Sequence, residues 1–182
     1  GEASTIVAVR GNRWEMQRPG VLDQRTLARL ARTEIVFVCT GNSCRSPMAE
    51  YFFRHRLDER LGMTQAQLAE AGYFVSSAGT FATSGGRISS GTLNELARRG
   101  IDAAAHRSQP VTVELLSRAE RVYVMTPEHG AAVRDELGSI AERVVMLDDR
   151  PISDPIGGDE EAYRHCGDQI AAAVERRVEE FL

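Results

Sequence analysis

The chain has 182 residues, a formal net charge of −4 and 42% apolar residues, enough for one domain with a buried core and a modest addition. No basic stripe indicates a nucleic-acid partner, and no apolar run reaches the roughly 18 residues of a membrane span. The three cysteines, Cys39, Cys44 and Cys166, are an odd and sparse set for a disulfide scaffold, so we expect a reducing, cytoplasmic setting.

Residues 1–32 are predicted to form a segment apart from the rest of the chain. Residues 4–9 and 14–16 predict two short strands around a turn at Gly11-Asn12, and Asp23 is expected to cap a following helix. Two short strands without a partner sheet are marginally stable alone. We therefore expect this segment either to pack on the main domain or to be the end of a preceding one.

Residues 33–182 predict one α/β domain in which strands alternate with helices. The continuous apolar run over 35–38 is typical of a strand buried on both faces. Further strands are predicted at 73–76, 121–125 and 143–147, and helices at 46–60, 90–99, 112–118, 127–137 and 160–182. The alternation predicts a four-stranded parallel sheet with helices on both faces, and ligands bind such sheets at the C-terminal edge of the strands.

The loop after the first of these strands is the candidate functional site. It comprises, in order, Cys39, Thr40, Gly41, Asn42, Ser43, Cys44, Arg45 and Ser46. The next helix is predicted to open at Ser46, with Pro47 in its favoured first position and Glu50 in the first turn. Backbone N–H groups of a tight loop at a helix N-terminus form an anion-binding concavity, so we expect phosphate or another oxyanion here.

Several residue types in this loop suit the binding and transfer of a phosphoryl group. Gly41 permits close approach of the backbone, and Asn42 tolerates a left-handed conformation. Arg45 offers a planar fork to two phosphate oxygens. The same positive field favours the thiolate form of Cys39, to which the Ser46 hydroxyl can donate a hydrogen bond. A cysteine and an arginine at this spacing are usually structural, but the strand–loop–helix context here favours a nucleophile.

The run from Val38 to Glu50 resembles the signature of the low-molecular-weight protein phosphatases. The likeness continues at Ser77-Ala78-Gly79-Thr80, His106-Arg107-Ser108 and Asp154-Pro155, and it covers about residues 34–182. The resemblance implies a flavodoxin-like three-layer sandwich that hydrolyses phosphorylated protein side chains through a cysteinyl-phosphate. No cofactor is expected, and no metal either, because the histidines, cysteines and aspartates lack metal-ligand spacing.

The resemblance implies a general acid in an Asp-Pro loop, and Asp154-Pro155 matches that loop by position and by neighbours. Pro155 disfavours the helical region for Asp154 and stiffens the loop. An Asp-Pro pair alone is an ordinary turn signal. The nearby alternatives for the acid are Asp148, Asp149 and Asp159.

The resemblance also implies side chains that support the loop from behind. His106 matches a histidine that holds the loop through Asn42, and the supporting serine lies within residues 76–78, where we favour Ser77. The remaining histidines, His55, His129 and His165, are predicted to be surface residues.

Two cysteines remain beside the nucleophile. In this family the second loop cysteine, here Cys44, can trap an oxidised Cys39 as a disulfide, and a space-filling role is the alternative. Cys166 lies on the last predicted helix and is expected to be incidental.

Substrate preference is expected to depend on Ser43, Phe81 and Ile156. Tyrosine-specific members carry a bulky aliphatic residue at the position of Ser43 and an aromatic pair after Asp-Pro. Bacterial protein-arginine-phosphatases instead carry threonine there and Asp-Pro-Phe-Gly-Gly in the acid loop, which residues 154–158 resemble apart from Ile156. A hydroxyl suits a polar guanidinium better than a phenyl ring, so phosphoarginine is favoured and phosphotyrosine is the alternative.

Two functions of other classes share this fold and loop. An arsenate reductase needs redox cysteines around residues 80–90, which hold none, and an inactive phospho-binding module would have lost Cys39, Arg45 or Asp154. At the N-terminus, residues 3–7 and 18–22 resemble the closing strands of threonylcarbamoyl-AMP synthase-type domains. That resemblance implies that the chain is a piece of a longer fusion protein.

Overall fold

The computed structural model describes residues 3–10, 13–137 and 142–182. The elements in chain order are β1 (Ile6–Arg10), β2 (Arg13–Arg18), α1 (Gln24–Leu30), β3 (Thr33–Cys39), α2 (Arg45–Leu61), α3 (Gln65–Glu70), β4 (Tyr73–Gly79), α4 (Ser90–Arg98), α5 (Val113–Arg118), β5 (Arg121–Val124), α6 (Pro127–Leu137), β6 (Val144–Met146), α7 (Glu160–Val178) and the 3-10 turn η2 (Glu179–Phe181). Within these ranges, no helix combines the length and apolar character that a membrane crossing requires.

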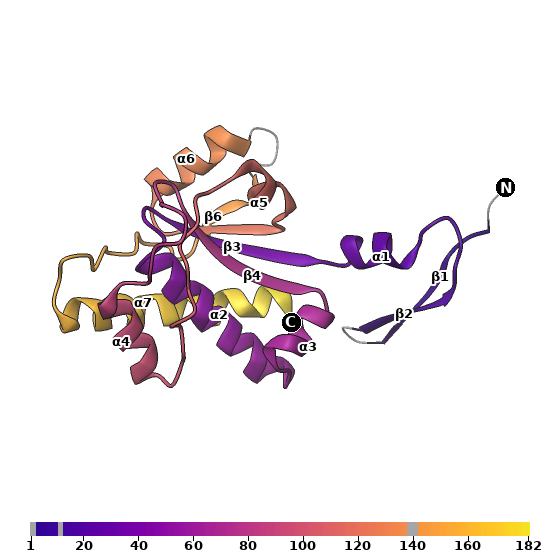
Figure 1. The fold of residues 1–182 in the computed structure, drawn as a ribbon, viewed down its shortest axis with the longest axis horizontal. Coiled ribbons are helices and arrows are strands. Elements are labelled where there is room, and N and C mark those ends of the chain that lie inside the picture. Colours follow the sequence, from indigo (N-terminus) through magenta and orange to yellow (C-terminus); the bar gives the residue numbers. More distant parts are fainter. Residues whose placement is uncertain (1–2, 11–12, 138–141) are drawn as a thin grey trace.

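The main domain is a four-stranded parallel sheet in the order β4-β3-β5-β6. Figure 1 shows its three layers, with α2, α4 and α7 on one side of the sheet and α5 and α6 on the other. The chain moves outward from β3 to β4 and then returns across β3 to β5 and β6. The C-terminal end of β3 is therefore the switch point at which such sheets bind ligands. The predicted fold class is confirmed.

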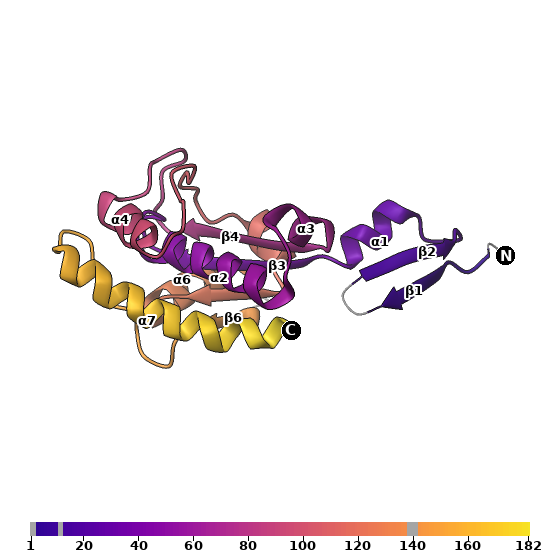
Figure 2. The ribbon, with the colours of Figure 1, turned by 90° about the horizontal axis from the view of Figure 1, so that it is seen from below.

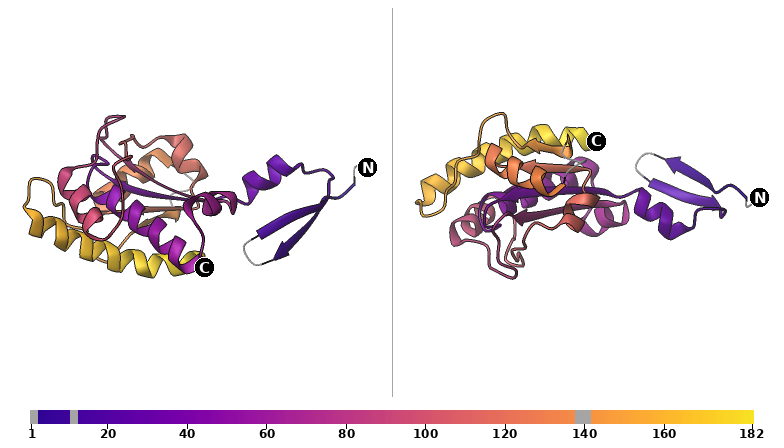
Figure 3. Two further views of the ribbon diagram at one scale, coloured as in Figure 1. Left: turned by 60° about the horizontal axis from the view of Figure 1, so that its bottom comes forward. Right: turned by 90° about the horizontal axis from the view of Figure 1, so that it is seen from above.

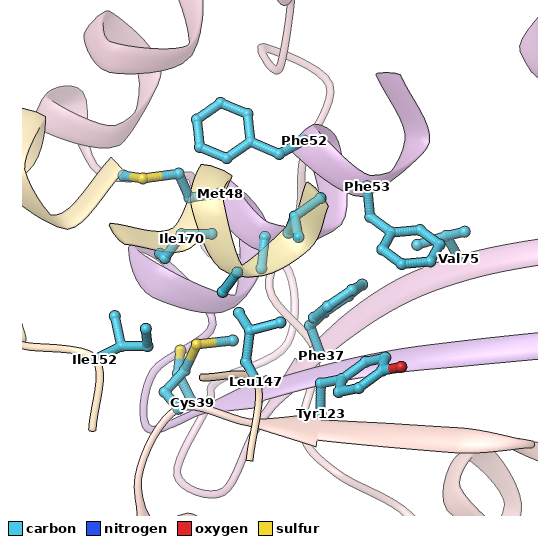
Figure 4. Close-up of a cluster of buried hydrophobic side chains, with 14 of the residues drawn as sticks. Phe37, Cys39, Met48, Phe52, Phe53, Val75, Tyr123, Leu147, Ile152 and Ile170 are labelled. Atoms are coloured by element: carbon cyan, nitrogen blue, oxygen red, sulfur yellow. The ribbon is translucent and has the colours of Figure 1, made fainter. Parts of the chain in front are cut away.

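Alternate residues of β3 supply the two halves of the core. Ile35 and Phe37 belong to the cluster under α2 and α7, whereas Val36 and Val38 belong to the cluster under α5 and α6. This explains why the strand is apolar at every position, as the sequence predicted. Figure 4 shows the first cluster, where the ring of Phe37 stacks on Tyr123 at 5.4 Å and Cys39 lies at the end nearest Ile152. The thiol of Cys39 thus extends from a rigid, fully packed strand.

The described residues before β3 form a hairpin and a short helix. Strands β1 and β2 pair with each other in antiparallel register, separate from the main sheet, and Figures 2 and 3 show the hairpin and α1 extending away from the domain. Asp23 accepts a hydrogen bond from the Thr26 backbone nitrogen at 2.7 Å, so the predicted helix cap is confirmed. The predicted turn at Gly11-Asn12 lies outside the described residues.

The start of α2 differs from the prediction. The helix begins at Arg45 with Cys44 as its N-cap, and the Met48 nitrogen bonds to the Cys44 carbonyl at 3.2 Å. Pro47 is therefore its third residue, a position that tolerates proline because the first N–H groups of a helix need no intrahelical partner. Glu50 is not in the first turn, and its buried carboxylate instead pairs with Arg54 at 2.7 Å.

One whole helix and the end of another were not predicted. Helix α3 was missed, although Thr64 and Gln67 form a capping box whose spacing is readable in the sequence. The last helix ends at Val178 and continues as the 3-10 turn η2, whereas the prediction ran unbroken to the final residue. The last turn of a helix is often a 3-10 turn, so the end of a helix is harder to predict than its interior.

Candidate active site

The loop from Cys39 to Arg45 lies at the switch point and is held against the end of β4. The Cys39 carbonyl accepts a hydrogen bond from the Thr80 nitrogen, and the Thr40 carbonyl accepts one from the Phe81 nitrogen, both at 2.9 Å. A side chain on Gly79 would clash with the Thr40 carbonyl oxygen and lie 2.9 Å from the Asn42 backbone nitrogen. A residue without Cβ is thus required at the end of β4 for the loop to pack this closely.

Asn42 shapes the turn of the loop, as the sequence predicted. It has a φ of 52° and is the one non-glycine residue of the described chain in the left-handed region. Its amide nitrogen donates to Ser46 Oγ at 2.9 Å and to Ser77 Oγ at 2.8 Å, and its side-chain oxygen accepts from the Gln109 nitrogen at 2.9 Å. Its backbone carbonyl contacts His106 Nε2 at 2.9 Å. The structure therefore brings His106 and Ser77 to Asn42 as expected.

A second layer of charge lies behind this network. Ser77 Oγ donates to Glu50 Oε2 at 2.5 Å, and Glu50 is itself paired with Arg54. The side chains of this network, Asn42, Ser77 and Glu50, are all buried. Because each has a hydrogen-bond partner, the loop rests on a satisfied polar network that disfavours other loop conformations.

The thiol of Cys39 is 2% exposed and lies 3.0 Å from Ser46 Oγ. Ser46 Oγ also lies 3.2 Å from the Ala78 carbonyl and already accepts a bond from Asn42. The hydroxyl has one proton, so it donates either to the carbonyl or to the sulfur. A thiolate at Cys39 would attract that proton, because a charged acceptor forms the stronger hydrogen bond.

Arg45, at the other end of the loop from Cys39, pairs with Asp154. Arg45 Nη1 donates to the Ile152 carbonyl at 3.2 Å, and its Nη2 forms an ion pair with the Asp154 carboxylate. The Asp154 carboxylate also accepts a bond from the Ile156 nitrogen at 3.2 Å. Arg45 Nε is buried and has no partner among the described residues. A guanidinium with a free buried donor at an anion-binding loop is suited to an oxyanion ligand.

The alternative aspartates serve other contacts. Asp148 pairs with Arg176 at 2.6 Å and accepts from Gln169 at 3.0 Å, which ties its carboxylate to α7. Asp159 caps α7 by accepting from the Ala162 nitrogen at 2.9 Å. Asp149 is exposed. Asp154 is the aspartate of this group that contacts Arg45.

The three residues predicted to govern specificity differ in exposure. Ser43 is half-buried in the loop, with its hydroxyl 3.6 Å from the Cys44 sulfur. Phe81 and Ile156 are 84% and 68% exposed. Phe81 lies two residues after β4, and its backbone nitrogen donates to the Thr40 carbonyl. Ile156 lies two residues after Asp154, which pairs with Arg45.

The other two cysteines are also buried. Cys44 Sγ lies 3.3 Å from Ser89 Oγ and 3.7 Å from the Tyr163 hydroxyl. Cys39, Cys44 and Cys166 are all free thiols, and burial raises the pKa of Cys166 to about 12. Cys166 is therefore an unreactive packing residue, whereas Cys44 contacts polar groups.

The prediction for His129 was wrong. His55 and His165 are exposed, but His129 is buried and lies 2.9 Å from Thr40 Oγ1 through its Nε2 atom. Its placement follows from the sheet order, because β5 adjoins β3 and α6 begins just past the end of β5. A signal was present in the sequence, since His129 comes shortly after a buried strand, at the same sheet edge as Cys39.

The loop at the C-terminal end of β3 combines an oxyanion-binding site with a cysteine thiol. The loop supplies backbone N–H groups and the Arg45 guanidinium for a phosphoryl group, and the Cys39 sulfur lies at its start with a carboxylate nearby. An arrangement of this kind splits phosphoryl transfer into two displacement steps through a covalent intermediate. The fold and the loop together define a thiol-dependent phosphatase.

Comparisons with known proteins identify the family. The model for "Low molecular weight phosphotyrosine protein phosphatase" matches residues 34–181. The chain is 34% identical over 143 residues to a protein-arginine-phosphatase of Bacillus subtilis, covering 75% of this chain and 89% of the relative. It is 30% identical over 148 residues to a probable low molecular weight protein-tyrosine-phosphatase, EpsP, of Ralstonia nicotianae, covering 79% and 92%.

A solved structure supports the same assignment. The YwlE arginine phosphatase, as a Cys-to-Ser mutant with a phosphorylated active-site serine, matches with a TM-score of 0.71 and 30% identity, covering 81% of this chain and 95% of that one. The chain belongs to the low molecular weight phosphotyrosine protein phosphatase family.

Proposed function

We propose that Cys39, Arg45 and Asp154 carry out the hydrolysis of phosphorylated protein side chains, with phosphoarginine as the favoured substrate. The observation that carries the mechanism is the meeting of the three side chains at one loop, with Cys39 Sγ 3.0 Å from Ser46 Oγ and Arg45 paired with Asp154. Cys39 and Arg45 lie at the two ends of one loop, and the fold brings Asp154, which is distant in sequence, to Arg45, so a phosphoryl group in this loop would have a nucleophile, a cation and a proton donor.

The proposed reaction has two steps. The Cys39 thiolate attacks phosphorus, the bond from phosphorus to the leaving nitrogen breaks, and protonated Asp154 gives its proton to that nitrogen. The Asp154 carboxylate then takes a proton from water, whose oxygen attacks phosphorus as the sulfur–phosphorus bond breaks and phosphate leaves. The relative YwlE with a phosphorylated active-site serine supports a covalent intermediate on the equivalent side chain.

The ion pair between Arg45 and Asp154 indicates that substrate binding precedes the action of Asp154 as an acid. A phosphoryl group carries more negative charge than a carboxylate and offers the guanidinium a bidentate partner, so its binding competes with Asp154 for Arg45. A carboxyl group that is no longer paired with Arg45 can turn toward the leaving group. We infer that substrate binding itself releases Asp154 to contact the leaving group.

Phosphoarginine is favoured by the polar character of the loop and by relatives. Ser43 presents a hydroxyl where a bulky aliphatic side chain would suit a phenyl ring, and the guanidinium of a substrate is a donor that a hydroxyl oxygen can accept. The protein-arginine-phosphatase of Bacillus subtilis is 34% identical to the chain. Phosphotyrosine is the second candidate, supported by the exposed aromatic ring of Phe81 beside the loop.

Phosphate release from matched phosphoarginine and phosphotyrosine peptides tests this proposal. We expect the chain to prefer phosphoarginine, the variant Ser43→Ile to shift the ratio of kcat/KM toward phosphotyrosine, and Cys39→Ser to lose turnover by roughly 10⁵-fold or more. A preference of the unmodified chain for phosphotyrosine would overturn the proposed substrate preference but would leave the proposed mechanism standing. Turnover by Cys39→Ser at the normal rate would overturn the mechanism.

Two further parts of the proposal concern the chain as a whole. We infer that residues 33–182 form the phosphatase domain, supported by a family match that begins at residue 34 and by a hairpin, β1–β2, that pairs only with itself among the described strands. The relation of residues 1–32 to a preceding threonylcarbamoyl-AMP synthase-type domain stays a prediction. So does the cytoplasmic location, which the three free thiols support.

A further inference from the structure

The two ends of the loop are held in different ways. Asn42 and Arg45 are buried, and Asn42 is bonded to Ser46 and Ser77. Thr40 and Gly41 are exposed, although their N–H groups belong to the same anion-binding turn. The one side-chain hydrogen bond that the described residues supply to this exposed part joins Thr40 Oγ1 to His129 Nε2 at 2.9 Å.

His129 is itself fixed from its other side. It is 6% exposed, and its Nδ1 atom lies 2.9 Å from Thr126 Oγ1, at the junction between β5 and α6. The imidazole thus connects the exposed part of the loop to the end of the neighbouring strand. Its ionisable neighbours are Arg45 at the start of α2, Glu128 on α6 and Asp154 in the loop before α7.

Each ring nitrogen of His129 has one hydroxyl partner. Burial, and then the charge of Arg45, lower the pKa of His129, so near pH 7 its ring is neutral and has one donor and one acceptor nitrogen. The hydroxyls of Thr40 and Thr126 can each donate or accept, so both hydrogen bonds form in either tautomer of the ring.

We propose that His129 is a positioning residue of the active site, whose hydrogen bond between Nε2 and the Thr40 hydroxyl holds Thr40 and Gly41 in the anion-binding conformation. The inference rests on the proposed function, because it assigns His129 a part in binding the phosphoryl group. His129 acts only through Thr40. Without this bond the exposed part of the loop gains conformational freedom that oxyanion binding must then remove.

Two substitutions of His129 by an amide side chain distinguish its hydrogen bond to Thr40 from its hydrogen bond to Thr126. The amide of His129→Gln reaches as far along the side chain as Nε2 and can keep the bond to Thr40, whereas the amide of His129→Asn reaches only as far as Nδ1 and can keep the bond to Thr126. We expect the dissociation constant of inorganic phosphate, measured by calorimetry and by competitive inhibition, to rise about three- to tenfold in His129→Asn and to stay within about twofold in His129→Gln. The exposed histidine variant His55→Gln is the matched control.

The same bond is tested from its other end, which keeps the inference testable if the His129 variants do not fold. Thr40→Val should weaken phosphate binding about three- to tenfold and Thr40→Ser should restore it. The double variant Thr40→Val with His129→Asn should bind phosphate no more weakly than either single one, because both remove one interaction. Equal affinities of the Thr40→Val and Thr40→Ser variants, or of the Gln and Asn variants, would overturn the inference.

Phosphate binding by the unmodified chain distinguishes a failure of the proposed function from a failure of the role of His129. Failure of the unmodified chain to bind phosphate would overturn the proposed function and this inference together. Normal phosphate binding by the unmodified chain and by Thr40→Val would overturn the role of His129 alone.

Discussion

The buried floor of the site, formed by Cys39, Asn42, Ser46 and Ser77, differs from its rim, formed by Phe81 and Ile156, in how the side chains are held. Each floor residue is hydrogen-bonded to another of the set and is at most 2% exposed. The rim residues are 84% and 68% exposed. A satisfied buried network tolerates few substitutions, whereas exposed side chains can change at little cost in stability. Chemistry is therefore built into the floor, and the rim is free to adapt to a substrate.

The largest expected effect concerns Asp154, which belongs to neither set and links to the loop through Arg45. In Asp154→Asn the amide cannot give a proton to the leaving group, so kcat for a phosphoarginine peptide should fall about 10²- to 10⁴-fold. Steady-state kinetics measure this loss. The neighbouring variant Asp149→Asn, at an exposed position, is the control. Equal losses in the two variants would assign the acid role elsewhere.

A change in the floor should lower stability as well as activity. Ser77→Ala removes the hydroxyl that joins Asn42 to Glu50, leaving buried polar groups with fewer partners. The free energy of unfolding, measured by urea denaturation, should fall by about 1–3 kcal/mol. Ser76 pairs with Val36, on the opposite face of the sheet, so Ser76→Ala should cost less. Identical losses from both substitutions would show that the network adds nothing to stability.

A smaller loss of stability is expected when the pH is lowered, because His129 then takes up a proton. Burial lowers its folded-state pKa below the ordinary 6.5, so the unfolded chain binds the proton more readily. The stability that this neutral ring contributes is complete above about pH 6.5 and is lost as the pH falls toward the folded-state pKa. The unmodified chain should therefore lose free energy of unfolding relative to His129→Gln between pH 7.5 and pH 5, as denaturation at each pH would measure. A constant difference across that range would contradict this.

The smallest effect on stability is expected at the rim. Phe81→Ser removes an exposed ring, so the free energy of unfolding should change by no more than about 0.5 kcal/mol. Its KM for phosphotyrosine peptides should rise more than its KM for phosphoarginine peptides, because a ring stacks on a ring. Val113→Ser, an exposed apolar position on α5, controls for general surface effects. If the two KM values move together, Phe81 has no part in specificity.

Much of this molecule could be predicted from local sequence. The apolar run of β3 predicts a strand that is buried on both faces. The alternation of strands and helices predicts a parallel sheet with a ligand site at one edge. The loop from Cys39 to Arg45 and the left-handed Asn42 follow from residue types at close spacing, whereas the acid candidate Asp154 follows from the resemblance to a known family. Such features depend on neighbours in the chain, which is why they are readable without coordinates.

Long-range contacts were decided only by the tertiary structure. The strand order β4-β3-β5-β6 brings the end of β5 beside the loop and buries His129, which looked like a surface residue in the sequence. The same packing explains why Gly79 must lack a side chain and why Glu50 faces Ser77 instead of the end of its helix. A position shortly after a buried strand can place a polar side chain such as His129 at the correct edge of the sheet, but its burial and its partners depend on which elements pack together.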